Sequence, residues 1–214
     1  MQLTRTPFSL RRLLLATLVL LPLTAAADDP VASGERVILH TNKGDITIAL
    51  YPDKAPQAVA NFLQYARDGF YTNTLFHRVK SRSLIQGGGF DISGVEKETR
   101  EPVVNESDNG LRNTRWSVGA ARRADPDSAN SQFYINLGMN FEFDPRFGKP
   151  GYTVFGVVTD GQAVVRDISL VKTHSTNGFN DVPVEPVVIE RVEIVPAATA
   201  AVETTVETTM GAAP

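Results

Sequence analysis

The stretch that decides the fold is TLFHRVKSRSLIQGGGF, residues 74–90. It begins with the apolar residues of a β-strand and ends in three consecutive glycines. Leu84 and Gln86 lie two positions apart, so in an extended strand they share one face of a sheet. Arg78 precedes Gln86 by eight residues, an even number, and in an unbulged extended segment it points the same way. An arginine, an amide and an apolar side chain on one face form a surface that can hold a peptide backbone.

Short apolar segments separated by turn residues surround this stretch and predict further strands. Ile46, Ile48 and Leu50 alternate with smaller or polar residues, the pattern of a half-buried strand. The glycine-containing turn before them, residues 42–45, predicts a hairpin. The other predicted strands span residues 36–41, 116–121, 131–137, 152–158, 187–189 and 192–194. The long polar passage at residues 91–115 is expected to be functional or disordered.

Two segments have the apolar spacing of helices. The first carries one apolar stripe at positions i, i+3, i+4 and i+7, formed by Val59, Phe62, Leu63 and Ala66. Pro56 suits its first position, and Gly69 suits a left-handed cap after its last turn. A second helix is expected at residues 162–170. Because two helices cannot cover both faces of a large parallel sheet, the pattern predicts a small closed antiparallel barrel with the helices plugging its ends.

The two ends of the chain differ in composition from its middle. Residues 1–27 combine a basic start, a short leucine-rich run and a small-residue end, which are the three parts of a secretory signal peptide. The run is shorter than the roughly 20 residues of a membrane span, so an uncleaved anchor is the less favoured alternative. Residues 28–35 form a polar lead-in, and residues 36–196 form the folded domain. Residues 197–214 are rich in Ala, Thr, Val and Glu and predict a disordered tail.

Composition limits the partners and the compartment. Cleavage of the signal peptide would remove three of the 21 basic residues and leave 18 against 24 acidic ones, a net charge of −6. That balance argues against a nucleic-acid partner, which requires a basic face. The chain has no cysteine, and therefore no disulfide, no thiolate nucleophile and no lipid-bearing cysteine after the signal. We expect a periplasmic protein without membrane insertion after signal cleavage, with secretion as the second choice.

Most familiar site patterns are missing from the sequence. The glycine run lacks the features of a dinucleotide fingerprint, and there is neither a Walker lysine nor a Gly-x-Ser-x-Gly motif. The three histidines are too far apart for metal-ligand spacing: His40, His77 and His174. His77 lies in a predicted strand and is interpreted as a structural histidine rather than a base. Three loop carboxylates are interpreted as solvated acids without a catalytic role: Asp125, Asp127 and Asp144. We expect no metal and no cofactor.

Several motifs occur together in an order that is specific as a set. They are Phe76-His77-Arg78-Val79, Ile85-Gln86-Gly87-Gly88-Gly89-Phe90, Asn109-Gly110, Ser131-Gln132-Phe133-Tyr134-Ile135 and Val154-Phe155-Gly156. With them, the chain resembles the cyclophilin-type peptidyl-prolyl cis-trans isomerases over about residues 36–196. The signal peptide and residues 105–112 are most similar to the periplasmic bacterial branch. The resemblance implies a mainly β fold, a closed eight-stranded antiparallel β-barrel capped by two α-helices.

The resemblance also implies a mechanism. An X–Pro bond interconverts over a barrier of about 18–20 kcal/mol because amide resonance must be broken, and this takes tens to hundreds of seconds without a catalyst. Arg78 matches the family's catalytic arginine, a fixed donor near the prolyl carbonyl and nitrogen. Gln86 matches the glutamine that orients this arginine and touches the substrate. Each tenfold acceleration needs only about 1.4 kcal/mol, so one well-placed charged donor supplies a large share.

The expected proline pocket departs from the family pattern. Ser83 stands where an aromatic residue is usual, and Glu142 where the family has an aromatic residue, often tryptophan. Phe143 and Tyr152 are the candidates to refill part of the pocket. Because a buried aromatic wall is commonly worth a few kcal/mol, its loss predicts weaker turnover or shifted specificity. The resemblance assigns substrate binding to Phe76, Ser83, Leu84, Ala121, Arg122, Gln132, Tyr134, Phe143 and Tyr152.

We therefore expect an exported, monomeric peptidyl-prolyl cis-trans isomerase that binds proline-containing segments of unfolded or exposed polypeptides and assists their folding. The alternative is a binding module on the same barrel, a chaperone or scaffold that holds such segments with weak or no isomerase activity. Arg78, Gln86 and Gln132 favour the enzyme. Ser83 and Glu142 favour the binding module.

Overall fold

The computed structural model describes residues 35–176 and 178–196, all of which belong to one structural unit. The predicted signal peptide, most of the predicted lead-in and the predicted tail lie outside the described residues, so these three stay predictions. Within the described part of the chain, no helix combines the length and the apolar character needed to cross a membrane.

In this part of the chain, nine strands form one sheet in the hydrogen-bonded order β3-β11-β1-β2-β8-β6-β7-β5-β4. All its neighbouring strands are antiparallel. The strands are β1 Arg36–Thr41, β2 Gly44–Leu50, β3 Thr74–Leu75, β4 Arg78–Lys80, β5 Leu84–Gly87, β6 Ser117–Ala120, β7 Phe133–Asn136, β8 Val154–Asp160 and β11 Val188–Val195. A separate hairpin is formed by β9 Thr173–Thr176 and β10 Phe179–Pro183, and the helices are α1 Pro56–Arg67, α2 Gln162–Ser169 and the short 3₁₀ helix η1 Phe141–Phe143.

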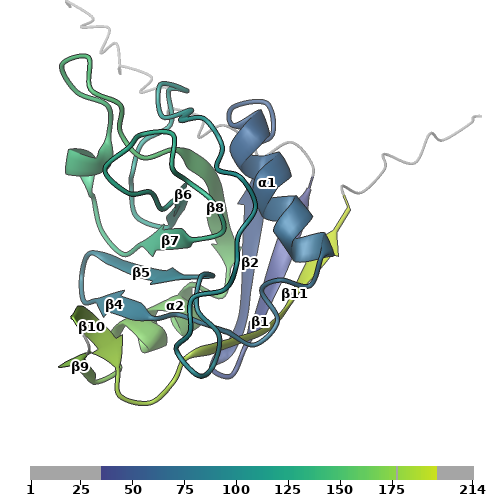
Figure 1. The fold of residues 1–214 in the computed structure, drawn as a ribbon, viewed down its shortest axis with the longest axis vertical. Helices are drawn as coiled ribbons and strands as arrows, with labels where there is room; N and C mark the ends of the chain where they lie inside the picture. Colours follow the sequence, from purple (N-terminus) through teal and green to yellow (C-terminus); the bar gives the residue numbers. More distant parts are fainter. Residues whose placement is uncertain (1–34, 177, 197–214) are drawn as a thin grey trace, which may run out of the picture. The chain divides into compact units, whose positions relative to one another are not determined.

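The nine-stranded sheet curls into a half-barrel (Figure 1), and α1 lies against β11. The mainly β fold with two α-helices is confirmed. The predicted closure into an eight-stranded barrel is not confirmed, because the described sheet has nine strands and ends at the edge strands β3 and β4. These two edge strands are consecutive in the chain and are joined by Phe76 and His77. Backbone bonds also reach β3 from the end of the glycine run, since Leu75 N donates to Phe90 O over 2.9 Å.

The deciding stretch, residues 74–90, is not one extended strand. β4 and β5 form a hairpin whose turn contains Arg82 in the left-handed region, with φ of 65°. Arg78 lies directly opposite Gln86 in this antiparallel ladder. The two side chains share a face because they are cross-strand partners, and the even spacing of an extended segment is not the reason.

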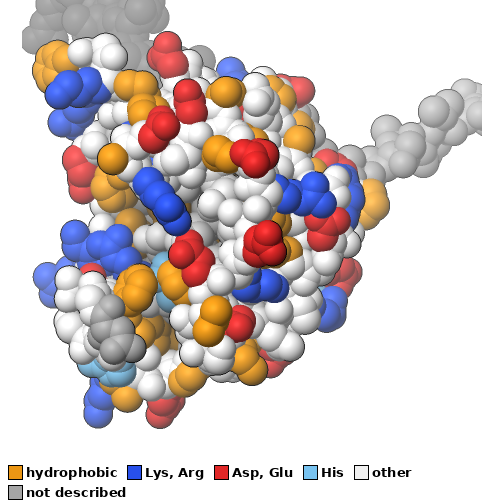
Figure 2. Space-filling model, in the orientation of Figure 1, with side chains coloured by type: hydrophobic (Ala, Val, Ile, Leu, Met, Phe, Trp, Pro, Cys, Tyr) orange, Lys and Arg blue, Asp and Glu red, His pale blue; other side chains and the backbone are white. Residues whose placement is uncertain are grey.

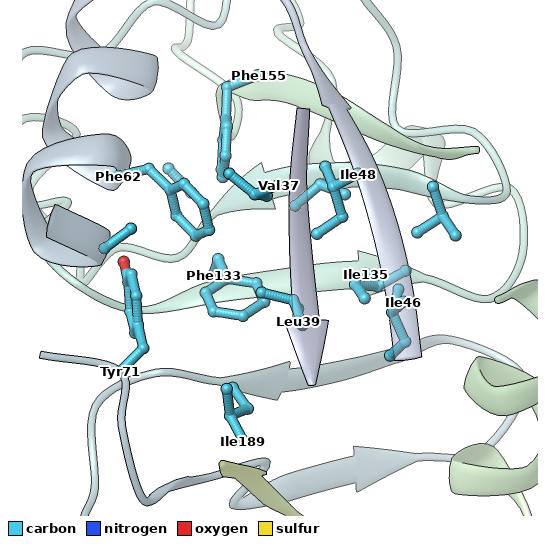
Figure 3. Close-up of a cluster of buried hydrophobic side chains, with 14 of the residues drawn as sticks. Val37, Leu39, Ile46, Ile48, Phe62, Tyr71, Phe133, Ile135, Phe155 and Ile189 are labelled. Atoms are coloured by element: carbon cyan, nitrogen blue, oxygen red, sulfur yellow. The ribbon is translucent and has the colours of Figure 1, made fainter. Parts of the chain in front are cut away.

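Helix α1 begins at Pro56 as predicted, and Gly69 follows its last turn with φ of 67°. Its apolar stripe is buried against the sheet. In the core, Phe62 of α1 contacts three rings with centroid distances of 5.1–5.4 Å, those of Tyr71, Phe133 and Phe155 (Figure 3). Apolar side chains of the strands pack around these rings, among them Val37, Leu39, Ile46, Ile48, Ile135 and Ile189 (Figure 3).

Three features of the remaining chain were not predicted from the sequence. The two short strands expected at residues 187–194 form the single strand β11, in which a β-bulge opposite His40 and Thr41 leaves Glu190 unpaired. The hairpin β9–β10 has no counterpart in the predicted elements. The polar passage at residues 91–115 has a structural role, because its side chains bond to the strand end at β8, as Asn109 Nδ2 does by donating to Val154 O over 3.0 Å.

Candidate active site

Three polar side chains form a hydrogen-bonded row across β4, β5 and the residue before β7. Arg78 Nη1 donates to Gln86 Oε1 over 3.4 Å, and Gln86 Nε2 donates to Gln132 Oε1 over 2.9 Å. The amide of Gln86 therefore accepts on its oxygen and donates from its nitrogen, which fixes both its orientation and that of its neighbours. The structure thus brings together the three residues that favoured the enzyme.

The third glycine of the run makes room for this row. A Cβ atom at Gly89 would lie 2.5 Å from Cγ of Gln132, closer than real side chains approach. Any larger residue at this position would displace Gln132 from Gln86. The backbone of Gln132 is fixed as well, because Ala121 N donates to its carbonyl oxygen over 3.0 Å.

Arg78 has a second anchor that the sequence did not indicate. Its Nε lies 3.7 Å from Oδ2 of Asp181 in β10, and the two side chains are 39% and 37% exposed. A half-exposed ion pair of this kind contributes little to folding stability. Its effect is on orientation, since Asp181 and Gln86 hold different nitrogens of the same guanidinium. No local sequence signal could find Asp181, because its partner lies about a hundred residues earlier.

The aromatic residues predicted to refill the pocket do come together. The ring of Phe143 lies 5.7 Å from that of Tyr134 and 5.0 Å from that of Tyr152. Tyr134 is 3% exposed, and its hydroxyl donates to Asn113 Oδ1 over 2.6 Å. Burial raises the pKa of Tyr134 well above its ordinary value, so the hydroxyl stays a donor. A Cβ at Gly119 would overlap the Tyr134 ring, so this position of β6 requires a glycine.

Ser83 forms part of a polar anchor. Asn140 Nδ2 donates to the Ser83 carbonyl oxygen over 2.9 Å, and Ser83 Oγ donates to Asn140 Oδ1 over 3.4 Å. Asn140 Nδ2 also donates to Oδ1 of the fully buried Asn136 over 2.6 Å. The turn between β4 and β5 is therefore tied to a buried amide network.

Arg122 is engaged by its own chain. Its three guanidinium nitrogens donate to the carbonyl oxygens of Gly151, Arg123 and Pro150 over 3.0–3.1 Å. Its Cζ lies 4.3 Å from the ring centroid of Tyr152. Arg122 thus braces the aromatic cluster with a cation–π contact.

The remaining predicted substrate-binding residues are mostly buried. Phe76 is 1% exposed and packs edge-on against Phe133 at 5.9 Å in the core, and Leu84 is 4% exposed. Neither offers a broad surface to a ligand. The role of each residue in binding stays a prediction.

The structure agrees with the interpretation of His77 as a structural histidine but not with that of Asp144 as a solvated acid. Burial, helped by the charge of Arg78, lowers the pKa of His77 to about 4, so its imidazole is neutral at pH 7, which fits a structural histidine. Asp144 is not a freely solvated acid, because its Oδ1 accepts hydrogen bonds from the backbone and side-chain nitrogens of Asn113 over 2.8 and 3.1 Å. Residues 35–176 and 178–196 contain no group of three metal-ligating side chains that could hold a metal ion.

Comparisons with known proteins agree on one family. The family model for cyclophilin type peptidyl-prolyl cis-trans isomerase/CLD matches residues 36–194. The chain is 48% identical over 162 residues to peptidyl-prolyl cis-trans isomerase B of Escherichia coli K12, covering 74% of this chain and 98% of that protein. It is 42% identical over 186 residues to peptidyl-prolyl cis-trans isomerase A of Dickeya dadantii, covering 86% and 98%.

A solved structure shares the fold. The cyclophilin type peptidyl-prolyl cis-trans isomerase cgd2_1660 of Cryptosporidium parvum superposes with a TM-score of 0.63 at 24% identity, covering 78% of this chain and 99% of that one. The family match spans nearly all of the described residues, including the row of Arg78, Gln86 and Gln132. The chain therefore belongs to the cyclophilin-type peptidyl-prolyl cis-trans isomerases.

Proposed function

We propose that this cyclophilin-type isomerase accelerates X–Pro isomerisation in exported proteins during folding, with Arg78 as its catalytic residue. The observation that carries the proposal is the double anchoring of Arg78, through Nη1 by Gln86 and through Nε by Asp181. A guanidinium held in this way donates without having to reorganise. Preorganised donors of this kind commonly supply the largest single share of transition-state stabilisation.

The chemistry needs no group beyond these side chains. In the twisted amide the resonance is lost and the prolyl nitrogen regains its lone pair, so a donor near that nitrogen binds the transition state more tightly than either ground state. Gln86 orients the donor, and Gln132 fixes Gln86. The half-buried rings of Phe143 and Tyr152, backed by the buried Tyr134, provide an apolar surface against which a proline ring can pack.

The rival function is a binding module that holds proline-containing segments without useful turnover. One observation favours it: Ser83 anchors the β4–β5 turn through Asn140 where the family usually has an aromatic residue. The exported location and the monomeric state belong to the same proposal, and the sequence of residues 1–27 supports the location.

The test compares Arg78→Ala with the parent on X–Pro tetrapeptides, by a protease-coupled assay or NMR exchange. We expect kcat/KM to fall about 10²–10³-fold, as it does when a preorganised donor is lost. Arg166→Ala, which changes an exposed arginine of α2, is the matched control and should leave kcat/KM unchanged.

Two results would contradict parts of the proposal. Full activity in Arg78→Ala would exclude the arginine mechanism. A parent that binds the peptides but does not accelerate their exchange would establish the binding module instead.

A further inference from the structure

An apolar cavity of about 300 Å³ lies close to Arg78, between the β9–β10 hairpin and the turn that follows the glycine run. Phe90 and Ile92 line it from the turn, and Phe179, Val182 and Pro183 line it from the hairpin. Figure 2 shows hydrophobic side chains and a histidine gathered beside this hairpin, at the lower left of the view. Phe76, His77 and Phe90 of the sequence motifs also line the cavity, but its wall from the hairpin was not predicted.

The walls of the cavity are held by ring contacts. Phe179 packs edge-on against Phe90 with centroids 5.6 Å apart, and Phe90 lies 4.6 Å from the ring of His77. The neutral imidazole of His77 adds no charge to the wall at pH 7. Phe179 and Ile92 nevertheless remain 49% and 61% exposed. Large apolar side chains left exposed around a cavity are typical of a binding surface.

The cavity adjoins Arg78 along the chain, although none of Arg78, Gln86 and Gln132 lines it. His77 lines the cavity and immediately precedes Arg78, while Val182 lines it and immediately follows Asp181, the ion-pair partner of Arg78. From Asp181 to Pro183, the strand advances about 7 Å at about 3.3 Å per residue. An extended polypeptide advances by the same length per residue, so a side chain two or three residues from a proline at Arg78 lies about 7–10 Å away, within range of this cavity.

We propose that this cavity is a second subsite for the polypeptide substrate, and that it takes a large apolar side chain two or three residues from the isomerised proline. The inference rests on the proposed function, since it assumes that the X–Pro bond lies at Arg78. It narrows the substrate class to segments in which a residue such as Phe, Leu or Met lies near the proline. Unfolded chains expose such side chains, whereas folded proteins bury most of them.

The experiment uses peptides with one X–Pro bond and serine elsewhere, in which phenylalanine is placed in turn at each of the three positions on either side of the proline. NMR exchange measures kcat and KM without a protease whose own specificity would interfere. We expect phenylalanine to raise kcat/KM about tenfold at one or more positions in the parent, mainly through a lower KM. In Phe179→Ala, the ratio of kcat/KM for the phenylalanine peptide to kcat/KM for the serine peptide should fall to about one.

Phe147→Ala is the matched control, because it removes a fully exposed phenylalanine from the loop before β8 and should keep the preference. Phe179→Leu should retain part of it. If the parent isomerises the peptides without any preference for phenylalanine, or if Phe179→Ala keeps the preference, the subsite is excluded and the isomerase function stands.

Failure of the isomerase function can be told apart from failure of the subsite. If the parent accelerates none of the peptides, the proposed function fails, and fluorescence anisotropy with the same peptides then tests the cavity alone. A phenylalanine-dependent affinity that Phe179→Ala abolishes would support the subsite, and equal affinities would exclude it.

Discussion

The resemblance predicts an aromatic ring at the position of Ser83, and the contacts of Ser83 show how the turn is held with a serine there. Asn140 bonds both the carbonyl and the hydroxyl oxygen of Ser83, and it is itself bonded to Asn136 in the core. Buried polar groups that are fully bonded fix one arrangement, because any shift leaves them unsatisfied. The turn between Arg78 and Gln86 is therefore held by hydrogen bonds rather than by a packed ring.

His77 makes stability depend on pH. Its pKa is about 4 in the folded protein against 6.5 for an ordinary histidine. Between these values the unfolded chain binds a proton that the folded protein does not, so the free energy of unfolding falls as the pH falls. From pH 7 to pH 4.5 we expect the parent to lose about 2–3 kcal/mol more than His77→Gln. Urea unfolding at both pH values measures the difference.

The control for this prediction is the exposed His174 in β9. His174→Gln should keep the pH dependence of the parent. Equal pH dependence in the parent and in His77→Gln would show that His77 is not the group responsible.

At the scale of elements, helix α1 depends on a residue that lies far from it in the chain. Its own N-cap residue, Ala55, makes no side-chain cap. Glu106 replaces it: Oε1 accepts from Gln57 N over 3.1 Å and Oε2 accepts from Ala58 N over 2.9 Å. The carboxylate satisfies two free N–H groups and lies at the positive end of the helix dipole. The polar passage at residues 91–115 thereby supplies the N-terminal cap of α1.

Removal of this cap should lower the free energy of unfolding. Glu106→Ala leaves the two N–H groups without their acceptor, and we expect the free energy of unfolding to fall by about 1–2 kcal/mol. Chemical denaturation at pH 7 measures it. Glu101→Ala, which removes an exposed acid from the same passage, should change the stability by less than about 0.5 kcal/mol. A cost for Glu106→Ala no larger than that of Glu101→Ala would contradict the capping role.

The β9–β10 hairpin contributes site residues that the sequence analysis did not predict. It adds Asp181 to the anchoring of Arg78, and Phe179, Val182 and Pro183 to the wall of the cavity. Its sequence has weak strand character, and β9 is exposed along its whole length. The sequence therefore did not predict that this hairpin lies beside β4.

At the scale of the whole molecule, the chain is expected to act outside the cytoplasm. If residues 1–27 are a cleavable signal, the mature protein begins at Asp28. Expression of the full chain in a Gram-negative host should yield this species in the periplasmic fraction, as measured by intact mass and N-terminal sequencing. Ala27→Arg should block the cleavage, because the site accepts only small residues. Recovery of the uncleaved parent chain from the cytoplasm would contradict the prediction.

The sequence by itself determined most of the strands, both helices and the family motifs, since these depend on patterns within a few residues. Periodicity placed β1, β2 and α1, and the glycine run with its neighbours identified Arg78, Gln86 and Gln132. The sequence did not determine the number of strands in the sheet.

The contacts between distant side chains became known from the folded structure alone. It paired Arg78 with Gln86 across a hairpin and brought Asp181 to the same guanidinium. It also placed Glu106 at a helix end 48 positions away. Such contacts depend on ladder register and on chain closure over long loops, and neither leaves a local mark in the sequence.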